Sequence, residues 1–220
     1  MPRRNRLTPF GEPVDSGRGL VYGNRGCLHD AHGEIRRPFQ VKRWIACRLE
    51  FRGRKRELLQ PGRYTELFFL DEATAFAAGH RPCRECRYRD YQNFVTIWHN
   101  LYPGQAAAAG LIDARLHAER VEPRTRAQRR HAAPFASLPD GVFVAVDGDA
   151  FLVLGERLLR WTPLGYEGSA PRPAAGTADV LTPPSLLAVL ASGWESELPL
   201  LHTSAVTARG RVARATRRRG

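Results

Sequence analysis

The first half of the chain contains short strand-like runs followed by helix-like ones. Alternating apolar, β-branched and aromatic residues predict strands at residues 20–22, 44–51 and 64–69. A helix is predicted over 72–78, because Asp71 can cap its first turn and Gly79 suits the left-handed position beyond its end. Two longer helices follow, from about Cys83 through Trp98 and over about 105–121, where apolar residues recur at helical intervals.

From residue 138 the pattern changes to strands separated by tight turns. The strand-like runs occupy residues 141–146, 150–154 and 158–162. The turns 147–149 and 155–156 are short enough to join neighbouring antiparallel strands into a meander. A short helix is then predicted with Thr182 as its N-cap and its end at Ser192. The predicted fold class is therefore α+β.

These patterns divide the chain into five segments. They are a basic arm over 1–19, a module of short strands and helices over 20–104, a helix and basic linker over 105–137, a small antiparallel β domain with a short helix over 138–206, and a disordered basic tail over 207–220.

The charge of the chain points to a polyanionic partner. The sequence has 34 basic and 22 acidic residues, a net charge of +12, and Lys42 and Lys55 are its two lysines. Guanidinium groups bind phosphate oxygens in pairs, so nucleic acid bound through phosphate contacts is the predicted partner. An arginine-rich composition is also typical of a GC-rich genome, which leaves a neutral explanation open. No apolar run is long enough to cross a membrane or to serve as a secretion signal, so a cytoplasmic location is expected.

The four cysteines predict a metal site. In a cytoplasmic protein they are expected to be reduced, and a Cys-x-x-Cys pair then indicates metal binding before it indicates a disulfide. A tetrahedral zinc site with four thiolates would consist of Cys27, Cys47, Cys83 and Cys86. Two alternatives stay open. The cysteines could be buried core residues, or a neighbour of Cys27 could be the fourth ligand, from among His29, Asp30 and His32.

The segment around the Cys-x-x-Cys pair resembles a known family. Phe68-Phe69, Glu72-Ala73 and the run from Ala77 to Cys86 are similar to the second half of the zinc-binding N-terminal domain of the Ada DNA-repair proteins. The resemblance covers residues 68–86 and implies a zinc site with Cys83 and Cys86 as ligands. It also implies that 20–104 is an Ada-like, DNA-contacting module, and that the protein acts in DNA repair or alkylation defence.

The first half of this module departs from the family. Ada-like domains carry a Cys-x-x-x-Cys pair before the strand, and one of those cysteines accepts a methyl group from DNA. Here Cys27 and Cys47 are 20 positions apart, so the methyl-acceptor role is not carried over to either, and a structural zinc is expected. His80 stands where the family has Phe, which favours a supporting or phosphate-contacting role over metal ligation.

Other functions are also compatible with the sequence. Exposed arginines of the module, Arg52, Arg54, Arg81 and Arg84, are predicted to contact phosphates, with further contacts from 120–130 and from the tail. A metal-supported hydrolase or nuclease would use Glu66, Asp113, His117 and Glu119. Base stacking would use Trp161, Tyr166 and Trp194. Besides nucleic-acid binding and hydrolysis, the remaining alternative is a structural zinc module in an interaction adaptor.

Overall fold

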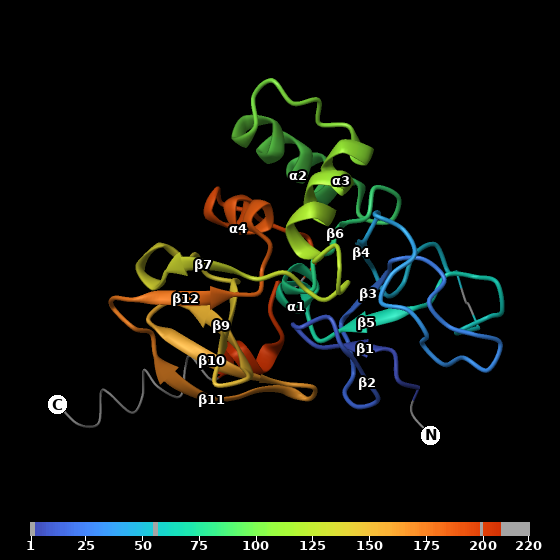
Figure 1. The fold of residues 1–220 in the computed structure, drawn as a ribbon, viewed down its shortest axis with the longest axis horizontal. Helices are drawn as coiled ribbons and strands as arrows, with labels where there is room; N and C mark the ends of the chain where they lie inside the picture. The colour runs from blue at the N-terminus through green and yellow to red at the C-terminus, as the bar shows by residue number, and fades with distance from the viewer. Residues whose placement is uncertain (1–2, 55–56, 199, 208–220) are drawn as a thin grey trace.

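The computed structural model describes residues 3–54, 57–198 and 200–207, and these form the α+β fold drawn in Figure 1. Within these residues the first sheet has six strands in the order β2-β1-β5-β3-β4-β6. They are β1 (Arg6–Leu7), β2 (Pro13–Val14), β3 (Val21–Asn24), β4 (Ile45–Cys47), β5 (Leu67–Phe69) and β6 (Arg81–Pro82). The three predicted strands are present, but the run at 44–51 ends as a strand at Cys47.

The predicted basic arm belongs to this sheet. Strand β1 pairs in parallel with β5, so that Arg6 lies opposite Phe68, and β2 pairs antiparallel with β1. Leu7 is buried in the core, and the Asn5 side-chain amide donates to the Glu66 carbonyl at 2.9 Å. Two-residue strands are too short to show an alternating pattern, so this pairing could not be predicted from the sequence.

The two faces of the first sheet have different surroundings, because successive side chains of a strand point to opposite sides. Val21, Ala46, Leu67 and Phe69 are buried in one cluster with Ala75 and Ala78, which belong to helix α1 (Glu72–Ala77) and its C-cap. The alternate residues, Tyr22, Ile45, Cys47 and Phe68, line a cavity. The sheet therefore has one face in the core and one face available for a ligand.

Helix α1 has the predicted ends. The Asp71 carboxylate accepts from the Thr74 backbone N–H at 2.8 Å, and Gly79 has φ +81° just past the C-cap residue Ala78. Helix α2 (Tyr88–Leu101) starts later than predicted, because residues 83–87 form a turn. Its aromatic residues Phe94 and Trp98 are buried as expected, and α3 (Ala109–Arg120) lies within the predicted range.

The second sheet is the predicted antiparallel meander with additional strands. Among the described residues its order is β11-β10-β9-β8-β12-β7. The strands are β7 (His131–Pro134), β8 (Phe143–Val146), β9 (Asp149–Leu154), β10 (Arg157–Thr162), β11 (Gly165–Pro171) and β12 (Thr177–Val180). The supposed linker thus supplies an edge strand, β7, which pairs with β12.

Helix α4 (Pro184–Ala191) follows the second sheet and ends at Ser192 as predicted. The expected N-cap is wrong: Pro183 holds that position, and the Thr182 hydroxyl instead accepts from the Phe143 backbone N–H at 3.0 Å. From residue 208 onward the predicted basic tail lies outside the described residues.

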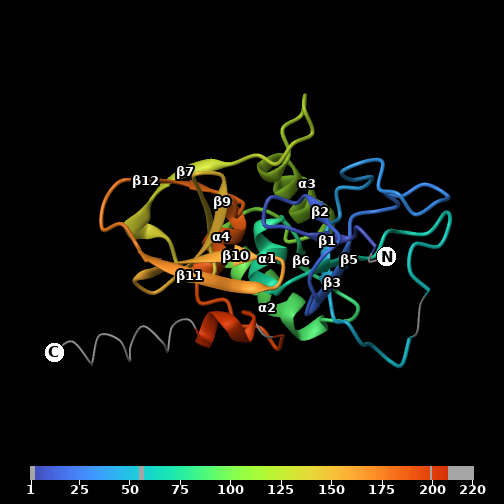
Figure 2. The same cartoon turned by 90° about the horizontal axis from the view of Figure 1, so that it is seen from below.

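The two halves of the chain share one interior. Figures 1 and 2 show α1 between the two sheets. Ala73 and Ala77 of α1 are buried in a cluster with Phe143 and Leu152 of the meander. Phe94 and Trp98 of α2 pack with residues of β8, β9 and α4. The module and the β domain are therefore packed together, and among the described residues no helix is long and apolar enough to span a membrane.

Candidate metal centre

Parallel pairing between β4 and β6 brings two cysteines together. Ile45 lies opposite Arg81 and Ala46 opposite Pro82, so the next residues along the two strands are Cys47 and Cys83. The Cys83 backbone N–H donates to the Ala46 carbonyl at 2.9 Å, which continues this register. The turn that starts at Cys83 then returns Cys86 to the same place.

The three sulfur atoms form a cluster that could hold a metal ion. The Sγ atoms of Cys47, Cys83 and Cys86 lie within 4.8 Å of one another, and in the part of the chain that the structure describes no other His, Cys, Asp or Glu joins them. The Arg48 backbone N–H donates to Cys86 Sγ at 3.4 Å, and the Arg48 side chain donates to the Cys86 carbonyl at 3.1 Å.

Hydrogen bonds within the cluster favour a thiolate at Cys83. The thiols of Cys47 and Cys86 donate to its sulfur, and backbone N–H groups of the turn add to this, so the pKa of Cys83 lies well below its ordinary value. The pKa of Cys47 is raised, first because its thiol donates to Cys83 and then because it is buried. The cluster thus favours one thiolate, at Cys83, which is the form of cysteine that binds a metal ion.

The structure places Cys27 outside this cluster, contrary to the four-cysteine prediction. Strands β3 and β4 are antiparallel, with Tyr22 opposite Cys47 and Asn24 opposite Ile45. Cys47 is the last residue of β4, whereas Cys27 follows the end of β3 that pairs with the start of β4. The two cysteines therefore lie at opposite ends of this strand pair. Its backbone N–H donates to the Gln40 side chain at 2.7 Å, and its Sγ lies 3.8 Å from the His29 carbonyl.

Three buried ion pairs, made by two arginines, fix the segment that carries Cys83 and Cys86. The Arg81 guanidinium donates to both carboxylate oxygens of Asp113, at 2.8 and 2.7 Å. The Arg87 guanidinium, directly after Cys86, bonds Glu72 of α1 and Asp90 of α2. The cysteine turn is therefore tied to three helices.

The three cysteines line a cavity of about 540 Å³ on the open face of the first sheet. Aromatic side chains share this cavity, among them Tyr22 and Phe68, whose ring centroids lie 5.9 Å apart. Its arginines are Arg43, Arg48, Arg54, Arg81 and Arg84, and its carboxylates are Glu66 and Glu85. The volume is in the range of ordinary ligand sites.

The predicted phosphate-contacting arginines have different surroundings. Arg81 is 2% exposed and bonded to Asp113, so it cannot reach a phosphate, and that prediction is wrong. Arg54 is exposed and paired with Glu85 at 2.7 Å, and Arg52 lies over the Phe51 ring. Arg84 is exposed at the cavity and has no carboxylate partner among the described residues. Arg43 shares these properties, although the sequence pattern did not single it out.

The predicted catalytic residues are not gathered into one site. Glu66 lines the cysteine cavity and accepts from the Leu59 backbone N–H at 2.8 Å. Asp113 is engaged by Arg81, and Glu119 accepts from the Ser185 hydroxyl and backbone N–H. His117 packs against the rings of Phe39 and Trp44. An acid–base group built from these four is therefore not supported.

The histidines beside Cys27 do not reach the metal centre. His29 is buried and bonds the Thr65 hydroxyl through Nδ1 at 2.6 Å, and Asp30 pairs with Arg36. His32 is exposed. His80 is fully buried and Nδ1 bonds the Ala78 carbonyl at 3.1 Å, so it contacts neither metal ligands nor surface phosphate.

The aromatic residues proposed for base stacking belong to the interior. Trp194 is buried in the core around α2 and α4. The Tyr166 hydroxyl donates to Asp71 at 2.8 Å, and Trp161 Nε1 donates to the Thr74 hydroxyl at 3.2 Å. These rings therefore stabilise α1 and do not offer a stacking surface.

No protein-family model, curated protein or solved structure matched this chain in the three comparisons.

Proposed function

We propose that the protein is a zinc-binding, nucleic-acid-binding protein that uses the open face of its first sheet. The observation that carries this proposal is the presence of three cysteines, aromatic rings and unpaired arginines around one cavity. The resemblance of residues 68–86 to Ada-like domains points the same way and suggests a role in DNA repair.

Zinc fits the donor set. Zinc–thiolate bonds of about 2.3 Å in a tetrahedral arrangement place the sulfurs about 3.8 Å apart. The three Sγ atoms already lie within 4.8 Å of one another, so small side-chain movements would close them on one ion. Cys47, Cys83 and Cys86 would hold the zinc, which would keep them as thiolates and join β4 to the cysteine turn. A ligand from the cavity would complete the coordination.

The charges around the cavity support an anionic partner. Zinc with three thiolates carries one net negative charge, so the attraction for phosphate has to come from the arginines. Arg43 and Arg84 are exposed and have no carboxylate partner among the described residues, whereas Arg48 and Arg54 are paired with Glu197 and Glu85. The aromatic rings of the same face offer stacking surfaces for bases.

Gel-shift titration of single-stranded and duplex DNA at several salt concentrations tests this function. Each arginine that neutralises a phosphate contributes about one unit to the slope of log affinity against log salt. The double variant Arg43→Gln/Arg84→Gln is therefore expected to bind more weakly and to lower that slope by about two units. Arg160→Gln, on β10 of the other sheet, is the matched control and should bind like the wild type. Equal binding by all three proteins would contradict the proposal.

A metal-supported hydrolase is the second candidate, and one observation favours it. Glu66 lines the same cavity as the three cysteines, so one bound substrate could contact both a carboxylate and the metal centre. Multiple-turnover cleavage of a nucleic acid that is lost in Glu66→Gln, with zinc content unchanged, would favour the hydrolase over the binding protein.

A further inference from the structure

A second cavity, of about 390 Å³, lies apart from the cysteines and has two arginines in its lining that are buried. Its walls come from the N-terminal segment 7–13, the loop 35–38 and the segment 120–128 after α3. Arg25 is 4% exposed and Arg120 is 1% exposed. Both guanidinium groups lie over the Trp44 ring, at 4.6 and 4.0 Å from its centroid.

Neither of these two arginines forms an ion pair with a carboxylate among the described residues. Arg25 donates to the Gly11 carbonyl at 3.0 Å, and Arg120 donates to the carbonyls of Gly79 and Lys42. The Nε atoms of both are buried without a hydrogen-bond partner. The other fully buried arginines, Arg81 and Arg87, are each paired with carboxylates. A buried charge without a counter-ion is unfavourable, so the contrast requires an explanation.

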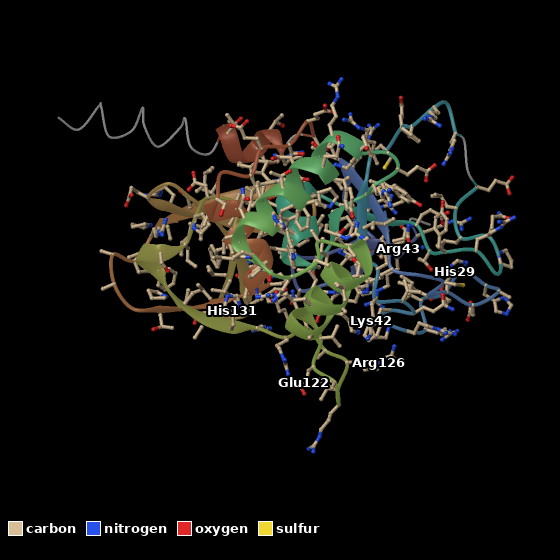
Figure 3. All side chains as sticks on the ribbon, turned by 90° about the horizontal axis from the view of Figure 1, so that it is seen from above. His29, Lys42, Arg43, Glu122, Arg126 and His131 are labelled. Carbon is tan, nitrogen blue, oxygen red and sulfur yellow. The ribbon has the colours of Figure 1, made fainter. Side chains whose placement is uncertain are left out.

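The surroundings add positive charge to this cavity. Arg36, Arg37 and Arg126 line it as exposed residues, and Glu12 is the acid in its lining. Arg36 is paired with Asp30, whereas Arg126 donates to the Phe39 carbonyl at 2.9 Å. Figure 3 shows Lys42 and Arg126 near each other beside the end of α3, and Glu122 lies on the same loop as Arg126. His80, packed against Trp44, stays neutral because burial and then the charges of Arg25 and Arg120 lower its pKa.

We propose that this cavity binds a phosphomonoester dianion, with the phosphate held by the guanidinium groups of Arg25 and Arg120. Two guanidinium groups without carboxylates match the two charges of such a phosphate, and their forked N–H groups match its oxygens. Apolar side chains of the same cavity, Leu7, Phe10 and Val121, would contact the organic part of the ester. The ligand is either a free phosphomonoester or the terminal phosphate of an oligonucleotide.

The burial of the arginines agrees with a bound anion. Burial lowers the pKa of Arg25 to about 9, and it lowers the pKa of Arg120 well below its ordinary value although the charge of Asp113 opposes this effect. An anion would reverse both effects, so its binding would be coupled to full protonation of the pair. This site does not depend on the zinc centre or on the proposed function.

Calorimetric titration and thermal unfolding of the full protein test the site with four probes. The probes are inorganic phosphate, 5′-AMP, and one oligonucleotide with either a 5′-phosphate or a 5′-hydroxyl. We expect saturable binding and a raised melting temperature with 5′-AMP or with the 5′-phosphorylated oligonucleotide, and weaker binding of inorganic phosphate. If 5′-AMP binds, with or without the 5′-phosphorylated oligonucleotide, the ligand is a free phosphomonoester. If only the 5′-phosphorylated oligonucleotide binds, the ligand is the terminal phosphate of a nucleic acid.

Variants connect this binding to the two arginines. Arg25→Met and Arg120→Met are each expected to weaken it by about thirtyfold or more, because a buried charged partner is removed. Arg25→Lys keeps the positive charge but loses the forked N–H groups of the guanidinium, and should weaken ligand binding by about tenfold. It serves as the test if the methionine variants do not fold. Arg160→Met is the control, and zinc content and salt-dependent DNA binding should be unchanged in all variants. Binding that survives in Arg25→Met and Arg25→Lys, or no 5′-phosphate-dependent binding of either 5′-AMP or the oligonucleotide at about 10 mM, would overturn the proposal.

Discussion

At the residue scale, His117 shows how the basic character of this protein affects its stability. The ring packs against Phe39 and Trp44, and its Nδ1 is buried without a hydrogen-bond partner. Burial, followed by the charges of Arg120, Lys42 and Arg126, lowers its pKa to about 4. In mild acid the His117 side chain is therefore neutral in the folded protein and protonated in the unfolded chain.

This difference predicts a loss of stability in mild acid. Between about pH 6.5 and pH 4 the unfolded chain binds a proton at His117 that the folded chain does not, so the free energy of unfolding falls as the pH falls. His117→Gln should lose less stability than the wild type between pH 7 and pH 5 in urea unfolding. The exposed His32→Gln is the control and should follow the wild type. A variant His117→Gln with the wild-type pH dependence would contradict the account.

Of the four cysteines that the sequence predicts as metal ligands, three lie together in the structure. The Cys-x-x-Cys spacing brings Cys83 and Cys86 together, and the structure adds Cys47 to them. Cys27 could not be excluded from the sequence, because its position depends on the antiparallel register of β3 and β4. Arg120 was included in the phosphate-contacting run 120–130 and Arg25 was not singled out, and the burial of both was missed because a basic residue in an arginine-rich chain gives no sign of burial.

At the scale of elements, the turn that carries Cys83 and Cys86 depends on Arg87. Its guanidinium is fully buried and is bonded to Glu72 of α1 and Asp90 of α2. Removing it would leave two carboxylates in the interior without their partner. The turn is thus held by charge as well as by the β4–β6 pairing.

Arg87→Met is expected to lower the free energy of unfolding by about 3–5 kcal/mol. It should also weaken zinc binding, because Cys86 directly precedes the substituted residue. Urea unfolding and competition with a coloured zinc chelator measure the two effects. Arg89→Met, an exposed position on the same helix, is the matched control and should change both by little. Wild-type stability and zinc affinity in Arg87→Met would show that the buried pairs do not support the turn.

The elements themselves were predictable where local chemistry decides them. Asp71 and Gly79 mark the ends of α1, and the turn at Asp147 and Gly148 marks the meander. The start of α2 was misplaced because buried ion pairs, which are tertiary contacts, hold the turn before it. Strands β1 and β7 were missed because they are stabilised by neighbours distant in the sequence and are too short or too polar to show a pattern.

At the scale of the whole molecule, the two sheets share a core built around α1 and α2. Ala73 and Ala77 contact one side of the meander, and Phe94 and Trp98 pack with β8, β9 and α4. The sequence suggested a zinc module followed by a separate β domain, and the chelation of zinc would then unfold the module alone. A shared core instead couples the two halves.

Removal of zinc should therefore destabilise the entire protein in one step. We expect a single thermal transition before and after chelation, at a lower temperature without zinc, since the metal binds the folded state. Circular dichroism follows both halves, and tryptophan fluorescence compares Trp44 with Trp161 and Trp194. Two separate transitions in the chelated protein would contradict the shared core.

The central proposal is that three cysteines, and not four, hold one zinc ion. Zinc K-edge X-ray absorption of the reduced, purified protein measures this directly, because zinc–sulfur distances of about 2.3 Å are distinct from shorter bonds to oxygen or nitrogen. We predict one zinc per chain with three sulfur ligands and one lighter ligand, and an unchanged spectrum in Cys27→Ser. A four-sulfur spectrum that loses one sulfur in Cys27→Ser, or protein purified without zinc, would contradict the account.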